Sequence, residues 1–197
     1  MFICCLDLEG VLVPEIWIQV ARRTKIQDLR FTTRDIPDYD ALMKRRLKIL
    51  RRHHIKLRDI QKVISRIRPL PGAKSFLDKL RSHTQVVVLS DTYYEFAAPL
   101  MQKLGFPTLW CNRLVTGRSG YIASYRLRQK DGKAKAVRAL KEIGFKVKAV
   151  GDSYNDLTML KAAHQGVLFN PPSHIAKEYR MFKVAKNYKE LLRLLSR

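Results

Sequence analysis

Short apolar runs recur along the chain, and each of the first three ends in polar residues. They occupy residues 2–6, 85–89, 146–150 and 166–169. Runs this short, rich in β-branched side chains, are typical of strands buried on both faces of a parallel sheet. The pattern therefore predicts four central strands.

Between these runs the apolar residues recur at helical spacing. Helices are expected at residues 73–81, 94–104, 132–143, 157–163 and 188–195. A short strand at 108–111 and a β-hairpin over 114–128, which turns around Gly117 and Gly120, complete the pattern. Strands that alternate with helices predict an α/β fold with a doubly wound, Rossmann-like parallel sheet.

The first predicted strand is followed by a stretch without any strand signal. Residues 14–69 contain expected helices that begin at Pro14, at 39–52 and at 57–67, with a break at 32–37. The sequence PLPG at 69–72 marks the return to the alternating pattern. We expect a small helical cap domain at 14–69, inserted into a core domain formed by residues 1–13 and 70–197.

Composition narrows the class of protein. Hydrophobic residues make up 46% of the 197 residues, which excludes a disordered chain. No apolar run approaches a membrane span, and the N-terminus enters a strand without a basic leader, so neither a membrane partner nor a signal peptide is expected. The three cysteines fit neither a disulfide framework nor a zinc site. Reduced thiols and a cytoplasmic location are the expectation.

The net charge of +22 is the least ordinary feature of the composition. Such a charge fits a nucleic-acid or other anionic partner. It also fits an enzyme from a cell whose proteins are generally basic. The basic residues are spread along the chain, although residues 44–68 are dense in them. A nucleic-acid partner is therefore disfavoured but stays open, as does the oligomeric state, with a homodimer as one option.

Acidic and hydroxyl side chains collect where the first three strands end. They are Asp7 and Glu9, then Ser90 and Asp91, then Asp152, Asn155 and Asp156. The carboxyl ends of parallel strands meet at one edge of a sheet, where open α/β folds bind ligands. Carboxylates that converge there need a cation, and Mg²⁺ prefers such hard oxygen ligands. A hydroxyl group and a lysine from 130–135 would complete a site for a phosphoryl group.

These residues resemble the four motifs of the haloacid dehalogenase superfamily of phosphohydrolases. The matching stretches are LDLEGV, LSDT, a lysine at a helix start, and GDSYND. Further stretches resemble the bacterial phosphoserine–homoserine phosphotransferases, a group related to the phosphoserine phosphatases. They are EGVLVPEIW, TTRDIPDYD, LMK-x-RL, LSDT-x-YEF and LGFPTL, and the resemblance covers nearly the whole chain.

The resemblance implies a mechanism in which Asp7 attacks phosphorus and forms an aspartyl-phosphate. It implies that Mg²⁺ binds Asp7, Asp152 and the backbone carbonyl of Glu9, with Asp156 in support. Other residues would hold the substrate's phosphoryl group or support it: Ser90, Asp91, Lys133 and Asn155. Glu9 would act as general acid and then as general base.

The resemblance also implies how the cap selects a substrate. Glu15 would pair with an ammonium group and Arg46 with a carboxylate. O-phospho-L-serine carries both groups beside its phosphate, and homoserine would be the acceptor. This substrate implies an enzyme of serine and threonine biosynthesis. Two alternatives stay open: a phosphatase acting on another phosphomonoester, including nucleic-acid ends, and a basic nucleic-acid-binding protein on the same scaffold.

Overall fold

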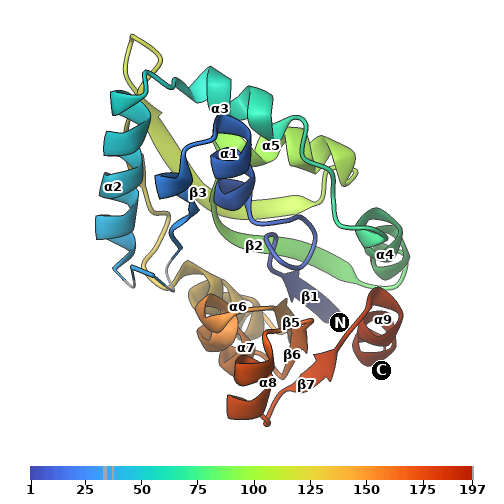
Figure 1. Cartoon of the computed structure of the whole chain (residues 1–197). Helices are drawn as coiled ribbons and strands as arrows, with labels where there is room; N and C mark the ends of the chain where they lie inside the picture. Colours follow the sequence, from blue (N-terminus) through green and yellow to red (C-terminus); the bar gives the residue numbers. More distant parts are fainter. Residues whose placement is uncertain (33–34, 37, 197) are drawn as a thin grey trace.

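The computed structural model describes residues 1–32, 35–36 and 38–196. Its centre is a seven-stranded sheet with the order β4-β3-β2-β1-β5-β6-β7 (Figure 1). The strands are β1 (Phe2–Leu6), β2 (Gln85–Tyr93), β3 (Thr108–Thr116), β4 (Ile122–Arg126), β5 (Lys146–Gly151), β6 (Gln165–Phe169) and β7 (Lys183–Ala185). Every neighbouring pair is parallel except β3 and β4. The predicted α/β fold with a parallel sheet is confirmed.

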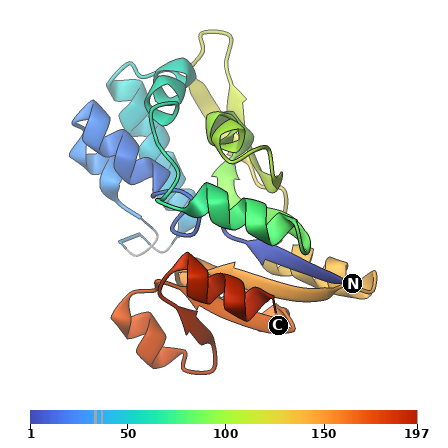
Figure 2. The same ribbon diagram turned by 90° about the vertical axis from the view of Figure 1, so that its right-hand side faces the viewer.

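Helices cover both faces of this sheet. On β1, Cys4 and Leu6 face one buried cluster, whereas Ile3 and Cys5 face the other. The first face is covered by α4 (Ala73–Arg81), α5 (Tyr94–Lys103) and α9 (Tyr188–Leu195). The second face is covered by α6 (Gly132–Glu142), α7 (Leu157–Ala162) and α8 (Ser173–Glu178). Helices α4 and α9 lie side by side near both ends of the chain (Figure 2).

The predicted helical insertion follows β1. It contains α1 (Ile16–Thr24), a short 3₁₀ helix η1 (Gln27–Arg30), α2 (Tyr39–Arg52) and α3 (Leu57–Ile64). In Figure 1 these blue to teal helices lie on the same side of the molecule as α5 and the β3–β4 hairpin. Their buried residues, such as Met43 and Ile60, belong to the same cluster as Phe96 of α5. The inserted helices therefore pack directly on the rest of the chain.

The chain leaves the core and returns to it at adjacent points. The backbone N–H of Leu70 donates a hydrogen bond to the carbonyl of Leu12 at 2.9 Å. We propose domain boundaries at these crossings, with residues 1–13 and 70–197 as the core and 14–69 as the cap.

Several elements differ from the pattern-based expectation. The helix expected at 57–67 ends at Ile64, because the N–H groups of Arg66 and Ile67 bond three residues back in tight turns. The expected strand at 108–111 and the first arm of the hairpin form the single strand β3. Strand β7 and helix α8 were not predicted. The expected break at 32–37 includes Thr33, Arg34 and Pro37, which lie outside the described residues.

The three cysteines are reduced, as the sequence predicts. Cys4, Cys5 and Cys111 are free and buried. Within the described ranges, none of the helices combines the length and apolar character that a membrane span requires.

Candidate active site

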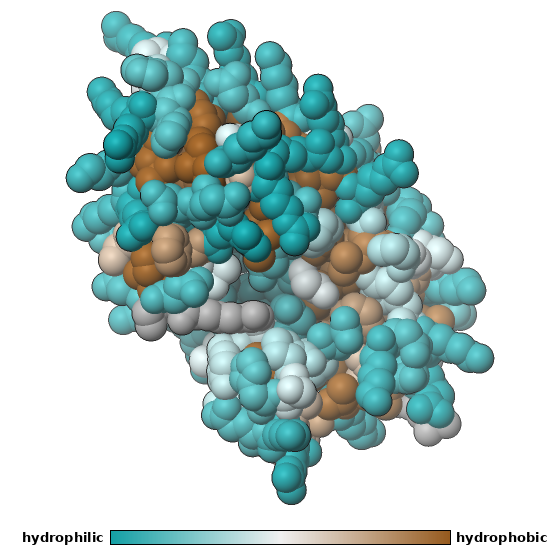
Figure 3. All heavy atoms as spheres, in the orientation of Figure 1, coloured by the Kyte–Doolittle hydropathy of each residue, from teal (hydrophilic) through white to brown (hydrophobic). Residues whose placement is uncertain are grey.

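The carboxyl ends of β1, β2 and β5 open into one pocket of about 270 Å³. This is near the lower end of the roughly 300–1,000 Å³ of ordinary ligand pockets, so it suits a small metabolite. All the predicted site residues except Asp156 line it: Asp7, Glu9, Glu15, Arg46, Ser90, Asp91, Lys133, Asp152 and Asn155. Figure 3 shows the surface hollowed between the inserted helices above and the part with α7 and α8 below.

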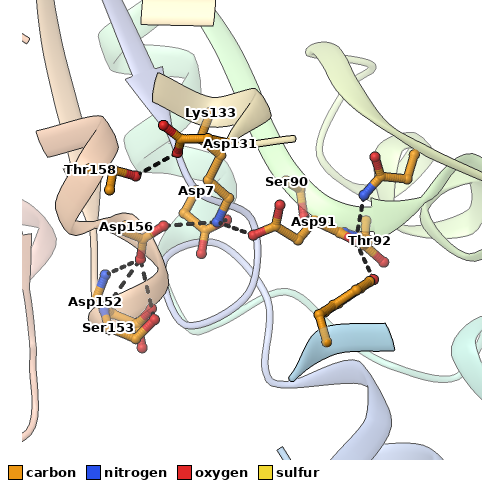
Figure 4. Close-up of polar contacts among 12 residues, drawn as sticks. Asp7, Ser90, Asp91, Thr92, Asp131, Lys133, Asp152, Ser153, Asp156 and Thr158 are labelled. Carbon is orange, nitrogen blue, oxygen red and sulfur yellow. Dashed lines mark hydrogen bonds and ion pairs between the residues drawn. The ribbon is translucent and has the colours of Figure 1, made fainter. Parts of the chain in front are cut away.

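Lys133, in the first turn of α6, lies at the centre of the acidic group (Figure 4). Its ammonium donates to Asp7 Oδ1 at 2.9 Å and to Asp156 Oδ1 at 2.8 Å, and lies 3.3 Å from Asp91 Oδ2. Lys133 is only 7% exposed and Asp156 is completely buried. Charges this deeply buried are stable only when paired and hydrogen-bonded.

Two glycines allow the acidic loops to approach one another. Gly10 has a positive φ of 79°, and a Cβ atom there would collide with the carboxylate of Asp152. A Cβ atom on Gly151 would collide with the side chain of Asp156. The carboxylates therefore meet because glycine occupies both positions.

The acidic group has the donors that a Mg²⁺ site requires. Carboxylate oxygens of Asp7, Asp152 and Asp156 lie within 4.8 Å of one another. Octahedral Mg²⁺ with ligands at 2.0–2.1 Å places its oxygens roughly 3–4 Å apart, so small side-chain movements would bring these three around one ion. Asp156 is held in place, because its Oδ2 accepts from the backbone N–H groups of Asp152 and Ser153 at 3.0 and 3.3 Å.

Burial and mutual repulsion shift the ionisation of this group. Burial, with the charge of Asp156, raises the pKa of Asp7 well above its ordinary value, against the opposing effect of Lys133. Burial alone would lower the pKa of Lys133, but Asp156 and Asp7 outweigh it and raise that pKa well above its ordinary value. Lys133 therefore stays charged.

Glu9 also lines the pocket, but its carboxylate does not belong to the group of Asp7, Asp152 and Asp156. Its Oε2 accepts a hydrogen bond from the backbone N–H of Ile16 at 2.7 Å, so the carboxyl is anchored at the start of α1. Burial and the nearby charge of Glu15 raise the pKa of Glu9 to about 8. A carboxyl group with this pKa holds a proton at neutral pH and can act as a general acid.

The inserted segment contributes Arg46 and Glu15 to the lining of the pocket. The guanidinium of Arg46 is buried, stacks 4.4 Å from the ring centre of Trp17, and donates to the carbonyl of Phe31 at 2.8 Å. Among the described residues, the buried Nε of Arg46 has no hydrogen-bond partner. An unpaired buried donor is costly unless a ligand accepts from it.

Other lining residues were not predicted as site residues. They are Trp17, Thr32, Tyr39, Leu42, Thr92, Tyr93, Ser153 and Tyr154. Trp17, Tyr39 and Leu42 lie in stretches that carry the family resemblance, but no role in the site was assigned to them. The hydroxyls of Tyr39 and Tyr93 lie 2.6 Å apart although 54 positions separate them. Residues so far apart in the chain leave no local sequence pattern that would predict their contact.

Two curated relatives match almost the whole chain. A phosphoserine phosphatase of Pseudomonas syringae pv. tomato is 56% identical over 189 residues, which cover 96% of this chain and 80% of the relative. The phosphoserine phosphatase ThrH of Pseudomonas aeruginosa is 55% identical over 193 residues, which cover 98% of this chain and 94% of the relative.

Several solved structures have a fold similar to that of this chain. A phosphoserine phosphatase in its apo form has a TM-score of 0.78 at 21% identity, and a phospho-aspartyl intermediate analogue of phosphoserine phosphatase has 0.79 at 19%. Both alignments cover 98% of each chain. At these identities the likeness shows the fold alone. The family model of the haloacid dehalogenase-like hydrolases, however, matches residues 3–164. With the acidic pocket at the expected edge of the sheet and relatives more than half identical, the chain belongs to the haloacid dehalogenase-like hydrolase family.

Proposed function

We propose that the protein is a Mg²⁺-dependent phosphoserine phosphatase that also transfers the phosphoryl group to homoserine. The observation that carries the proposal is the pairing of two groups across one pocket. Asp7 and Lys133 of the core line the same pocket as Arg46 and Glu15 of the inserted segment. The names of the two relatives support the same substrate.

In the first half-reaction, a carboxylate oxygen of Asp7 attacks phosphorus while the bond to the serine oxygen breaks. Lys133 holds Asp7 and would bind the phosphoryl oxygens together with Ser90. Glu9 gives its proton to the departing serine alkoxide. Asp7, Asp152 and the carbonyl of Glu9 would hold Mg²⁺ with support from Asp156; the ion, when bound, neutralises charge on the transferring group.

In the second half-reaction, the aspartyl-phosphate on Asp7 is attacked by water or by an alcohol. Glu9, now ionised, removes the proton of the attacking hydroxyl. We propose that its extra methylene, compared with aspartate, favours the alcohol. Glu9→Asp should then lower the ratio of transfer to hydrolysis, and an unchanged ratio rejects this role.

The cap contacts would select the amino acid. Arg46 would bind the substrate carboxylate, which satisfies its unpaired Nε, and Glu15 would bind the ammonium group. Asn155 and Asp91 line the same pocket and would support the phosphoryl end. The free cysteines support the further proposal of a cytoplasmic location.

The direct test is phosphate release from O-phospho-L-serine with Mg²⁺, with and without homoserine. We expect release that depends on Mg²⁺, phosphohomoserine in the second sample, and no activity in Asp7→Asn. Activity on an aryl phosphate but not on phosphoserine would favour another phosphomonoester. Inactivity on both, with salt-sensitive binding of DNA or RNA, would favour the nucleic-acid-binding alternative.

A further inference from the structure

Strand β2 is irregular where it enters the candidate site. Its ladder with β3 pairs Leu89 with Trp110 and then Tyr93 with Asn112. Residues 90–92 therefore stand opposite Cys111 alone and leave the regular register. The bulge carries Ser90 and Asp91 into the pocket.

Two side chains bind the backbone of this bulge in place of a regular ladder. The carbonyl of Asp91 accepts from Asn112 Nδ2 at 3.0 Å and from the hydroxyl of Tyr39 at 3.3 Å. Asn112 is itself fixed, since it is 6% exposed and its Oδ1 accepts from the backbone N–H of Arg128 at 3.0 Å.

Tyr39 brings the cap into the same network. It is the first residue of α2, and its hydroxyl lies 2.6 Å from that of Tyr93. With Tyr93 donating to Tyr39, the proton of Tyr39 is directed to the Asp91 carbonyl. Burial raises the pKa of Tyr39 to about 12, so the donor keeps its proton at neutral pH.

The side chain of Asp91 points the other way, to the phosphoryl site. Its Oδ2 lies 3.3 Å from Lys133 Nζ, the ammonium that also contacts Asp7. The backbone contacts of Asp91 thus help to fix where Lys133 and Asp7 lie. Displacements of about 1 Å in such a group can cost roughly 100-fold in rate.

We propose that Asn112 and Tyr39 are positioning residues for phosphoryl transfer, which act through Asp91 on Lys133 and make the reactive geometry depend on how the cap is seated. The proposal rests on the phosphatase function above. Neither residue takes part in the chemistry, and each acts through a single hydrogen bond to the Asp91 carbonyl.

The test compares Asn112→Ala, Asn112→Asp and Tyr39→Phe with the wild-type protein. Asn112→Asp keeps an acceptor for Arg128 but loses the donor to Asp91. We expect kcat for phosphoserine to fall about tenfold in both Asn112 variants and about threefold or more in Tyr39→Phe, with KM changed less than about twofold. The same losses should appear with an aryl phosphate, because the phosphoryl site is shared.

Two control variants lose similar bonds elsewhere. Tyr125→Phe removes a neighbouring hydroxyl that donates to Asp40 at 2.6 Å, and Asn187→Ala removes the side chain that caps α9. Both should retain wild-type kcat at a temperature where all the proteins are folded.

Other results overturn the proposal. If the variants lose thermal stability but keep kcat, the bonds to the Asp91 carbonyl only stabilise the fold. If Asn112→Asp keeps full activity, the hydrogen bond that Asn112 donates to Asp91 has no role in positioning. If Asn112→Ala does not fold, Tyr39→Phe decides, since it removes one oxygen atom. A wild-type protein inactive on both substrates rejects the proposed function as well, whereas an active wild type with unaffected variants rejects only this inference.

Discussion

Arg46 shows how much a single position depends on its surroundings. Its neighbour Arg45 has the same side chain, but it is exposed and lies over the ring of Phe31. Arg46 lines the pocket and is buried against Trp17, and its buried Nε has no hydrogen-bond partner among the described residues. Adjacent residues on a helix point about 100° apart, so Arg45 faces solvent and Arg46 lines the pocket.

Arg46→Lys tests the substrate contact. A lysine keeps the charge but cannot bind a carboxylate with two parallel bonds or stack as a flat group on Trp17. We expect KM for phosphoserine to rise about 30- to 100-fold, which corresponds to losing roughly 2–3 kcal/mol from a charged hydrogen bond. Steady-state kinetics on phosphoserine and on an aryl phosphate measure this; the aryl phosphate should be little affected.

Arg45→Lys is the matched control and should behave as the wild type. If both variants raise KM equally, the effect does not depend on the contacts that Arg46 alone makes in the pocket. The assignment of Arg46 would then be wrong.

Gly10→Ala tests the approach of the acidic loops. The substitution adds a methyl group both at a positive φ and in the space of the Asp152 carboxylate. We expect a loss of roughly 1–3 kcal/mol in the free energy of unfolding from strain, and loss of the stabilisation by Mg²⁺ because Asp152 is displaced. Thermal unfolding with and without Mg²⁺ measures both effects.

Gly144→Ala separates strain from collision. Gly144 has a φ of 93°, but apart from its chain neighbours no described residue has an atom within 4 Å of a Cβ placed there. This variant should lose stability and keep the Mg²⁺ response. A Gly10→Ala protein that responds fully to Mg²⁺ would contradict the role of Gly10.

At the scale of elements, the start of α6 runs against ordinary helix preferences. Lysine in a first turn opposes the partial positive charge of a helix N-terminus. Lys133 lies in this first turn nonetheless. Asp131, the residue before the helix, has a φ of 54°, and its side chain accepts a hydrogen bond from the hydroxyl of Thr158 at 2.8 Å. The helix start is thus arranged around the acidic site.

Lys133→Met removes the cation from that site. Asp7 and Asp156 would then be buried without their partner, and we expect a loss of roughly 3–5 kcal/mol in the free energy of unfolding at neutral pH. Lys133 opposes the rise in the pKa of Asp7, so without it that pKa would rise further above its value in the unfolded chain. The loss should therefore shrink as the pH is lowered and Asp7 is protonated.

Urea unfolding between pH 5 and pH 8 measures this effect. Lys135→Met, an exposed lysine on the same helix, should change stability little at any pH. An equal loss at pH 5 and pH 8 would mean that packing, rather than charge, causes the effect.

At the scale of the whole molecule, the three thiols report on cooperative unfolding. Cys4 and Cys5 lie on β1 at the centre of the sheet, and Cys111 lies on β3. Burial raises the pKa of Cys4 to about 11 and those of Cys5 and Cys111 to about 12. Since only the thiolate reacts, all three should be inert at pH 8 in the folded protein.

A colorimetric disulfide reagent at pH 8 measures this inertness. We expect no reaction of the native protein, and reaction of three thiols per chain in denaturant. Rapid labelling of one thiol under native conditions would show that its strand opens locally, without global unfolding.

The sequence alone determined the features that depend on neighbouring residues. The central strands appeared as apolar runs, and helix 39–52 was predicted with the bounds that α2 has. The carboxylates at strand ends could be assigned to one edge, because parallel topology fixes which ends meet. Strand β7, of three residues, is too short to show a periodic pattern.

Only the tertiary structure decided what depends on residues far apart in the chain. The β2 bulge arises from pairing with β3 within the core, the stacking of Arg46 on Trp17 arises within the cap, and the bond from Tyr39 to Asp91 forms where the cap packs on the core. Local periodicity reports which face of an element is buried, but not which partner covers it. The physical reason is that such contacts are set by the packing of whole elements, which no single segment encodes.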